Sequence, residues 1–162
     1  MASIRQQIVD EVYRRLRQIT EANGYTREVG AQGVLNAKVP PQASLPTPAI
    51  LVLQEPDDPP NETASDSYIR TMDVAVGFVD SEHGDDPDAE ANEFLADIQR
   101  AMAGTLHLTV DRIVGGTQVI KIPFLEFGAV LNQGAHLANR IYGQVSYRLT
   151  YRTSRDDPSK MP

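Results

Sequence analysis

The sequence contains no cysteine and no tryptophan, and only 6% of its 162 residues are aromatic. Without cysteine the chain can have no disulfide framework, no thiolate-bound zinc or iron–sulfur site and no cysteine nucleophile. No apolar run comes near the roughly 20 residues that a membrane-spanning helix needs. Charged residues also interrupt the first eighteen residues too often for a signal peptide. We therefore expect a soluble, intracellular protein.

The chain is long enough to form a single stable domain without disulfide bonds or a bound metal ion. Domains of about 150 residues bury roughly 68–70% of the surface that the unfolded chain exposes. We expect one α+β domain over residues 1–153. The remaining residues, 154–162, are polar and include two prolines, so we expect a disordered tail there.

The formal net charge of −7 is concentrated in one part of the chain. Residues 1–54 sum to +2 and residues 94–162 to +3, whereas residues 55–93 sum to −12. The net negative charge disfavours nucleic-acid binding through the whole surface, because such binding neutralises phosphates with cationic side chains. The acidic residues gather in two segments rich in Pro, Ser, Asn and Gly, which are typical of loops. The carboxylates that we assign to these two loops are Glu55, Asp57, Asp58, Glu62, Asp66, Asp80, Glu82, Asp85, Asp86 and Asp88.

Two segments have the apolar spacing of amphipathic helices. Residues 3–22 place Ile, Val and Leu at three- and four-residue steps, and Ser3 stands where a helix cap is expected. Residues 87–103 follow Asp86, a favourable N-cap, and begin with a proline that suits a first helical turn. We expect one helix over each segment.

The remaining regular structure is predicted to be β-strand. Residues 68–79 and 141–152 alternate apolar and polar side chains, and each run is about twice the length of an ordinary strand. Shorter elements are expected as strands at 25–30, 34–39, 49–53, 106–110 and 119–131 and as a turn at 112–116. The order of elements predicts an α+β fold: an antiparallel or mixed sheet with two α-helices packed on one face and a long C-terminal strand.

No motif for catalysis or cofactor binding is present. None of the three histidines lies four residues from another, and the sequence has no nucleophile elbow, P-loop or dinucleotide-binding glycine pattern. An EF-hand match that starts at Asp80 fails at its fifth and twelfth positions. A looser Ca²⁺ or Mg²⁺ site at Asp85, Asp86 and Asp88 remains open, but we favour a solvated loop there. We expect no enzymatic activity, no metal and no cofactor.

Five segments carry a resemblance to a known family. They are SIRQQIVDEVYRRLRQI with the following GYTREVG, PAILVLQEPDD, YIRTMDVAVGFVD, PDAEANEFLADIQRAM and RIYGQVSYRLTYRT. In their order and lengths, over nearly the whole chain, they resemble the tail terminator proteins of tailed bacteriophages. The resemblance implies an α+β fold and a structural virion protein of the phage tail or neck. Such a protein is a homohexameric ring that caps the tail tube, stops its polymerisation and presents a joining surface to the head.

The same resemblance implies a set of partners. They are further copies of the chain, the tail tube protein and a head-connector or neck protein, with assembly in the host cytoplasm. DNA would pass through the lumen of the ring without specific binding, and neither a membrane nor a cofactor is implied. The family has no short motif from which functional residues could be carried over to this chain.

Two hypotheses follow about the surfaces of such a ring. The acidic loops would line the lumen or a ring face, where carboxylates repel DNA phosphates; alternatively, they only keep exposed loops soluble. The long strands would be covered by a neighbouring subunit, because strand faces and edges offer ready contacts. The residues that we assign to this interface are Tyr142, Gln144, Arg148 and Arg152.

Two other functions remain open. The chain could be another phage neck, head-closure or tail-completion protein or a minor tail subunit, because these proteins share its size and acidic character. It could also be a small-molecule-binding α+β domain, which would require a concave pocket with convergent polar groups.

Overall fold

The computed structural model describes residues 3–38, 46–56, 61–64, 67–81, 84–103, 106–108, 112–119 and 140–157. The helical elements are α1 (Ile4–Leu16), the 3-10 turn η1 (Glu21–Asn23), α2 (Gly30–Gly33) and α3 (Pro87–Ala101). The strands are β1 (Val34–Asn36), β2 (Ala49–Gln54), β3 (Asn61–Ala64), β4 (Ser67–Ser81), β5 (Leu106–Leu108), β6 (Arg112–Val119) and β7 (Arg140–Ser154).

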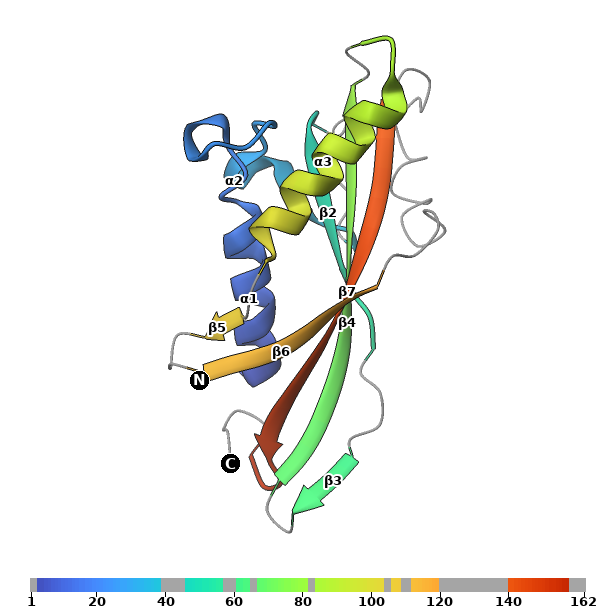
Figure 1. Ribbon diagram of the computed structural model, residues 1–162. Helices are drawn as coiled ribbons and strands as arrows, with labels where there is room; N and C mark the ends of the chain where they lie inside the picture. Colours follow the sequence, from blue (N-terminus) through green and yellow to red (C-terminus); the bar gives the residue numbers. More distant parts are fainter. Residues whose placement is uncertain are drawn as a thin grey trace.

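The strands form one sheet in the order β1-β2-β4-β7-β6-β5, and β3 pairs with β4 beside that path. β1 runs parallel to β2, whereas every other pair is antiparallel, so the sheet is mixed. Figure 1 shows the two long helices, α1 and α3, on the same side of the central strands. The predicted α+β fold, with two helices on one face and a long C-terminal strand, is confirmed.

Helix α1 begins where the sequence predicted and ends earlier. The Ser3 hydroxyl accepts a hydrogen bond from the Gln6 N–H at 3.1 Å, which caps the first turn. The helix ends at Leu16, although the apolar spacing continues to Ile19 and that side chain is fully buried. The apolar spacing therefore marks a buried face that continues along the chain beyond the end of the helix.

Two of the shorter predicted elements are wrong. Residues 25–30 form no strand, because the Val29 and Gly30 N–H groups both donate to the Ile19 carbonyl and so fold this segment back onto the end of α1. Residues 112–116 form no turn, because they belong to β6, which pairs with β7 from Gly115 onward. Of the predicted strand at 119–131, all but Val119 lies outside the described residues.

Strands β4 and β7 form a long antiparallel ribbon through the centre of the sheet. Each has 15 residues, and their register runs without a break from Ser67 opposite Ser154 to Ser81 opposite Arg140. At about 3.4 Å per residue the ribbon spans roughly 50 Å. Both predicted long strands are confirmed. Ser154 belongs to β7 rather than to the predicted tail, and residues 158–162 lie outside the described part of the chain.

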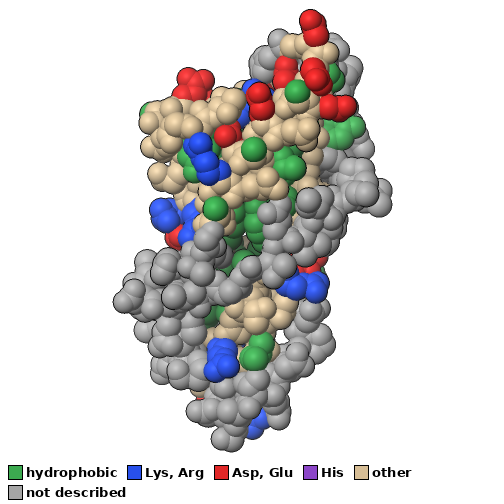
Figure 2. All heavy atoms as spheres, in the orientation of Figure 1, with side chains coloured by type: hydrophobic (Ala, Val, Ile, Leu, Met, Phe, Trp, Pro, Cys, Tyr) green, Lys and Arg blue, Asp and Glu red, His purple; other side chains and the backbone are tan. Residues whose placement is uncertain are grey.

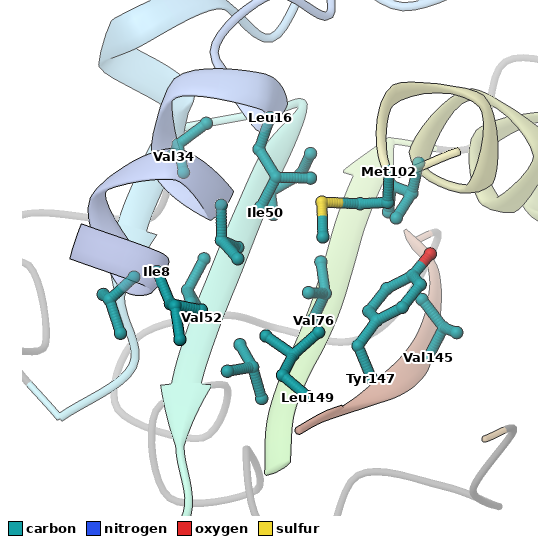
Figure 3. Close-up of a cluster of buried hydrophobic side chains, with 14 of the residues drawn as sticks. Ile8, Leu16, Val34, Ile50, Val52, Val76, Met102, Val145, Tyr147 and Leu149 are labelled. Carbon is teal, nitrogen blue, oxygen red and sulfur yellow. The ribbon is translucent and has the colours of Figure 1, made fainter. Parts of the chain in front are cut away.

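The main core lies between the helices and one face of the sheet. Figure 3 shows side chains of α1, such as Ile8 and Leu16, next to Ile50 and Val52 of β2. Fully burying one such side chain stabilises the fold by roughly 1.5–3 kcal/mol. On the α3 side, the rings of Phe78 and Phe94 pack with their centroids 4.6 Å apart.

The other face of the sheet is buried only in part. Ala49, Leu51, Ala75 and Val79 form a second apolar cluster on that face, each no more than 1% exposed. β7 continues the buried zone with Ser146 and ends it at Arg148, which is exposed. The polar face predicted for the C-terminal strand is therefore continuously exposed only over the last part of β7.

Candidate assembly surface

The exposed part of the ribbon is a distinct surface, which we call the distal outer face. It lies on the side away from the helices and is formed by Ile69, Thr71 and Asp73 of β4 and by Arg148, Thr150 and Arg152 of β7. In the ladder, Ile69 is opposite Arg152 and Asp73 is opposite Arg148. Figure 1 shows this end of the ribbon, together with β3, extending past the N-terminal end of α1.

A bidentate ion pair marks the upper boundary of the distal outer face. The Nε and Nη2 groups of Arg148 donate to the two carboxylate oxygens of Asp73 at 2.9 and 3.0 Å. Parallel hydrogen bonds of this kind fix both side chains in one plane. Arg152 differs, because no carboxylate of the described residues lies within ion-pairing distance of its guanidinium. Arg152 is therefore the cation that this surface can offer to a neighbouring molecule.

The opposite side of the same ribbon end carries a basic–aromatic cluster. The guanidinium carbons of Arg70 and Arg155 lie 5.6 and 5.2 Å from the ring centroid of Tyr68, a cation–π distance. Arg70 also donates to the Thr153 hydroxyl at 3.0 Å. Burial raises the pKa of the neighbouring Tyr151 phenol, an effect that Arg5 and, less strongly, Arg70 partly offset. Sequence reasoning missed this cluster, because it depends on the cross-strand register.

Acidic side chains gather at the other end of the molecule. Asp85, Asp86 and Asp88, which we call the acidic apex, are all exposed where α3 begins. Figure 2 shows carboxylates clustered over this end of the helix. Asp86 accepts a hydrogen bond from the Ala89 N–H at 3.0 Å, so the predicted N-cap is confirmed. Negative charge here also complements the helix dipole.

Asp80 does not belong to an acidic loop, which corrects the sequence-based assignment. It is part of β4 and only 2% exposed. Its Oδ2 atom lies 3.4 Å from Nε of Arg27, an ion pair without an aligned hydrogen bond. The Arg27 backbone N–H donates to Asp97 of α3. The Asp80 carboxylate thus neutralises a cation inside the fold, where it cannot face DNA or a neighbour.

The first predicted acidic loop is described only at its margins. Glu55 follows β2 and is half-buried; its N–H donates to the Asp73 carbonyl, and its own carbonyl accepts from Arg5, both at 2.9 Å. These bonds hold the Glu55 backbone between α1 and β4. Glu62 lies in β3 with its backbone opposite Tyr68. The remaining predicted carboxylates of the two loops, Asp57, Asp58, Asp66 and Glu82, lie outside the described residues.

The four predicted interface residues do not form one patch. Gln144 is only 6% exposed and lies inside the subunit, so its assignment to a subunit interface was wrong. Tyr142 is 42% exposed and lies opposite Val79, toward the acidic apex. Arg152 is ten residues further along β7, roughly 34 Å away. Tyr142 and Arg152 can therefore serve only different contacts.

In the described ranges, no group of three or more His, Asp or Glu side chains could hold a metal ion, so Asp85, Asp86 and Asp88 are not brought together as ligands. Among the helices described, none is long and apolar enough to cross a membrane. Neither protein-family models nor curated protein sequences gave a match to the chain. The proposed function rests on the fold and its surfaces, together with the resemblance in the order of elements.

Proposed function

We propose that the protein is a structural subunit of a phage tail, a tail terminator that forms a homohexameric ring, caps the tail tube and joins it to the head or neck. The observation that carries this proposal is the β4–β7 ribbon, which is longer than the core requires. Over Val74–Asp80 of β4 and Gln144–Tyr147 of β7 the ribbon is buried on both faces, whereas over the last residues of β7 one face is exposed. A strand pair that leaves the body in this way offers a face and edges to a neighbouring subunit.

The asymmetry of the subunit supports a ring over a symmetric dimer. One end carries the exposed carboxylates of the acidic apex, and the other carries Arg152 and the Tyr68 cluster. Two different surfaces that meet head to tail give a heterologous contact, which closes into a ring when the rotation between subunits allows it. Tyr142 and Arg152, at opposite ends of β7, would then contact different neighbours.

The acidic apex fits a surface that faces passing DNA. Its carboxylates are solvent-exposed, so they would repel phosphates without the counterion release that drives nucleic-acid binding. We propose that this apex lines the lumen or one face of the ring. The competing explanation, that it only keeps a loop soluble, predicts that neutralising these residues leaves DNA passage unchanged.

The experiment that tests the function is a tube-capping assay. The purified protein is added to polymerising tail tube protein, and tube lengths are measured by negative-stain microscopy. A tail terminator shortens the tubes and leaves a ring at one end, and Arg152→Glu weakens this effect while Lys38→Glu, an exposed control in a turn, does not. Unchanged tube lengths at saturating protein would contradict the proposal.

A second function within the same class stays open. A head-closure or tail-completion protein, or a minor tail subunit, could use the same asymmetric subunit with its two unlike ends. Labelling the protein on intact particles separates these roles, because a tail terminator lies at the head-proximal end of the tail tube.

A further inference from the structure

A reactive pair of residues lies at the end of the 3-10 turn η1, between α1 and α2. Asn23 is the last residue of the turn and Gly24 is its C-cap, in the left-handed region at φ +79°, and both are exposed. Asparagine followed by glycine is prone to cyclise, because glycine has no Cβ to keep its backbone nitrogen away from the asparagine side chain. Every other asparagine of the chain precedes a residue that carries a side chain.

The reaction open to this pair is deamidation. Hydroxide removes the proton of the Gly24 N–H, and the nitrogen attacks the side-chain carbonyl carbon, Cγ, of Asn23. The N–Cγ bond forms while the Cγ–Nδ2 bond breaks, and the Nδ2 group takes a proton from water and leaves as ammonia. Water then opens the cyclic imide at either carbonyl, which gives aspartate or isoaspartate. The net reaction consumes only water, so it needs no enzyme and no cofactor.

The fold holds both reacting groups in hydrogen bonds. The Gly24 N–H donates to the Glu21 carbonyl at 2.9 Å, which protects the proton that the reaction must remove. The Asn23 Nδ2 group donates to the Gln18 carbonyl at 2.9 Å. The reaction therefore requires the turn to open first, and its rate depends on how often η1 opens.

A contact with α3 keeps this turn closed from outside. Arg100 Nη2 donates to the Gly24 carbonyl at 2.6 Å. The guanidinium carbon of Arg100 also lies 4.0 Å from the ring centroid of Tyr25, which is a cation–π contact. The Tyr25 N–H in turn donates to the Thr20 carbonyl at 3.2 Å. Arg100 thus holds the two residues that follow Asn23 from a separate helix.

Deamidation would remove a hydrogen bond from the turn and add a charge to it. A carboxylate at position 23 has no proton to donate to the Gln18 carbonyl. It would also stand close to two other acidic residues, because Glu21 belongs to the same turn and its N–H donates to the Glu28 carboxylate at 2.7 Å. Like charges at such separations repel one another. The product therefore has a weaker connection between α1 and α2.

We propose that Asn23 is a site of spontaneous deamidation in the native protein, and that the contact with Arg100 sets the rate by keeping η1 closed. Each opening of the turn exposes the Gly24 N–H and frees the Asn23 side chain together. The modified chain carries a negative charge where the sequence has a neutral amide. The site is apart from the β4–β7 ribbon, so it does not depend on ring formation.

Peptide mapping by mass spectrometry follows the reaction in the full chain at mildly alkaline pH, with the same chain unfolded in guanidinium chloride as the reference. We expect Asn23 to react more slowly in the native protein by about tenfold to a hundredfold, as expected for the opening of an exposed turn. Asn92, which precedes Glu93, should stay unmodified in both samples. Equal rates at Asn23 would overturn the protection by the turn. Absence of product in the native protein, after the unfolded chain has reacted completely, would overturn the site itself.

A variant of α3 tests the role of the clamp. Arg100→Gln should raise the native rate by about two- to fivefold, the size of one exposed cation–π contact. Hydrogen exchange of the Gly24 amide should rise by the same factor, because both reactions remove its proton from the opened turn. Arg152→Gln removes the same charge elsewhere and should change neither rate. An unchanged native rate in Arg100→Gln, or a faster one without faster exchange at Gly24, would contradict control by this contact.

The aspartate product can be made directly by substitution. Asn23→Asp should lower the melting temperature by about 2–4 °C, because the turn loses a hydrogen bond and gains a carboxylate beside Glu21 and Glu28. Asn92→Asp adds the same charge at an exposed position of α3 and should leave the melting temperature unchanged. If Asn23→Asp melts at the wild-type temperature, deamidation does not weaken the turn and this part of the proposal is wrong.

Discussion

The guanidinium of Arg148 in β7 donates two hydrogen bonds across the ladder to the carboxylate of Asp73 in β4, at 2.9 and 3.0 Å. On the same face of β7, Ser146, which precedes Arg148, is buried, and Thr150, which follows it, is exposed. The pair therefore marks the place where the ribbon changes from a core element into a surface element. The proposed assembly role depends on the residues of the distal outer face, which begins at this pair.

Arg148→Gln should lower the free energy of unfolding by no more than about 1 kcal/mol, because the Arg148 side chain is 52% exposed and the pair is screened by water. Urea denaturation measures this change. Arg152→Gln is the matched control on the same strand and face and should have no effect. A loss of about 3 kcal/mol would mean that the pair behaves as a buried one.

Tyr147→Phe should not destabilise the protein at neutral pH. The Tyr147 hydroxyl is buried in the core, where Figure 3 shows its ring on the same side of the sheet as Met102, and it makes no hydrogen bond to any described residue. Removing an unsatisfied buried hydroxyl removes a desolvation penalty, so we expect a gain of up to about 1 kcal/mol. A loss of more than about 1 kcal/mol in urea denaturation would show that the hydroxyl has a partner.

The same residue makes stability depend on pH in the alkaline range. Burial raises the pKa of Tyr147 from 10.0 to about 12. Between these values the unfolded chain loses the Tyr147 proton while the folded chain keeps it, so the free energy of unfolding falls as pH rises through this window. Tyr147→Phe should remove that part of the fall, as measured by denaturation at pH 9, 10 and 11. If the free energy of unfolding falls equally with pH in the wild-type protein and in Tyr147→Phe, the pH dependence does not come from Tyr147.

Asp97→Ala should destabilise the fold by on the order of 2–3 kcal/mol. The Asp97 carboxylate is 4% exposed and accepts the backbone N–H groups of Thr26 and Arg27, both at 2.9 Å. Without it, two part-buried donors lose their acceptor and the segment before α2 loses its attachment to α3. Thermal denaturation measures the effect, and Asp88→Ala on the exposed face of the same helix is the control. Equal melting temperatures for the Asp97 and Asp88 variants would contradict the structural role.

Gly143→Ala should cost about 1–3 kcal/mol, because the added methyl group would overlap the ring of Phe78 in the opposite strand. The ring would have to move away from Phe94, with which it packs. Thr150→Ala, at an exposed position of the same strand, is the matched control. If both variants have the melting temperature of the wild-type protein, the Phe78 ring moves aside without loss of stability, which would contradict this prediction.

The elements that the sequence predicted well have a signal in their own local residues. Helix α3 carries its N-cap and its apolar spacing within one segment, and the long strands alternate over many residues. The element at 25–30 was mispredicted because Val29 and Gly30 bond to the carbonyl of Ile19, a contact between two separate segments. The residues of the segment 25–30, taken alone, cannot indicate such a bond.

The surfaces were predicted less well for the same reason. Asp80 stands beside other acidic residues in the sequence, but its partner Arg27 comes from a loop far earlier in the chain. Gln144 occupies a polar position of an alternating strand, yet that part of the face is buried.

The central claim is that the subunits close into a ring through unlike ends. Negative-stain imaging with mass photometry, over a range of protein concentrations and with tail tube protein present, tests it most directly. We expect closed rings of six copies, which Arg152→Glu abolishes and Lys38→Glu retains. A strictly monomeric protein that stays monomeric beside the tail tube, or a closed symmetric dimer, would contradict it.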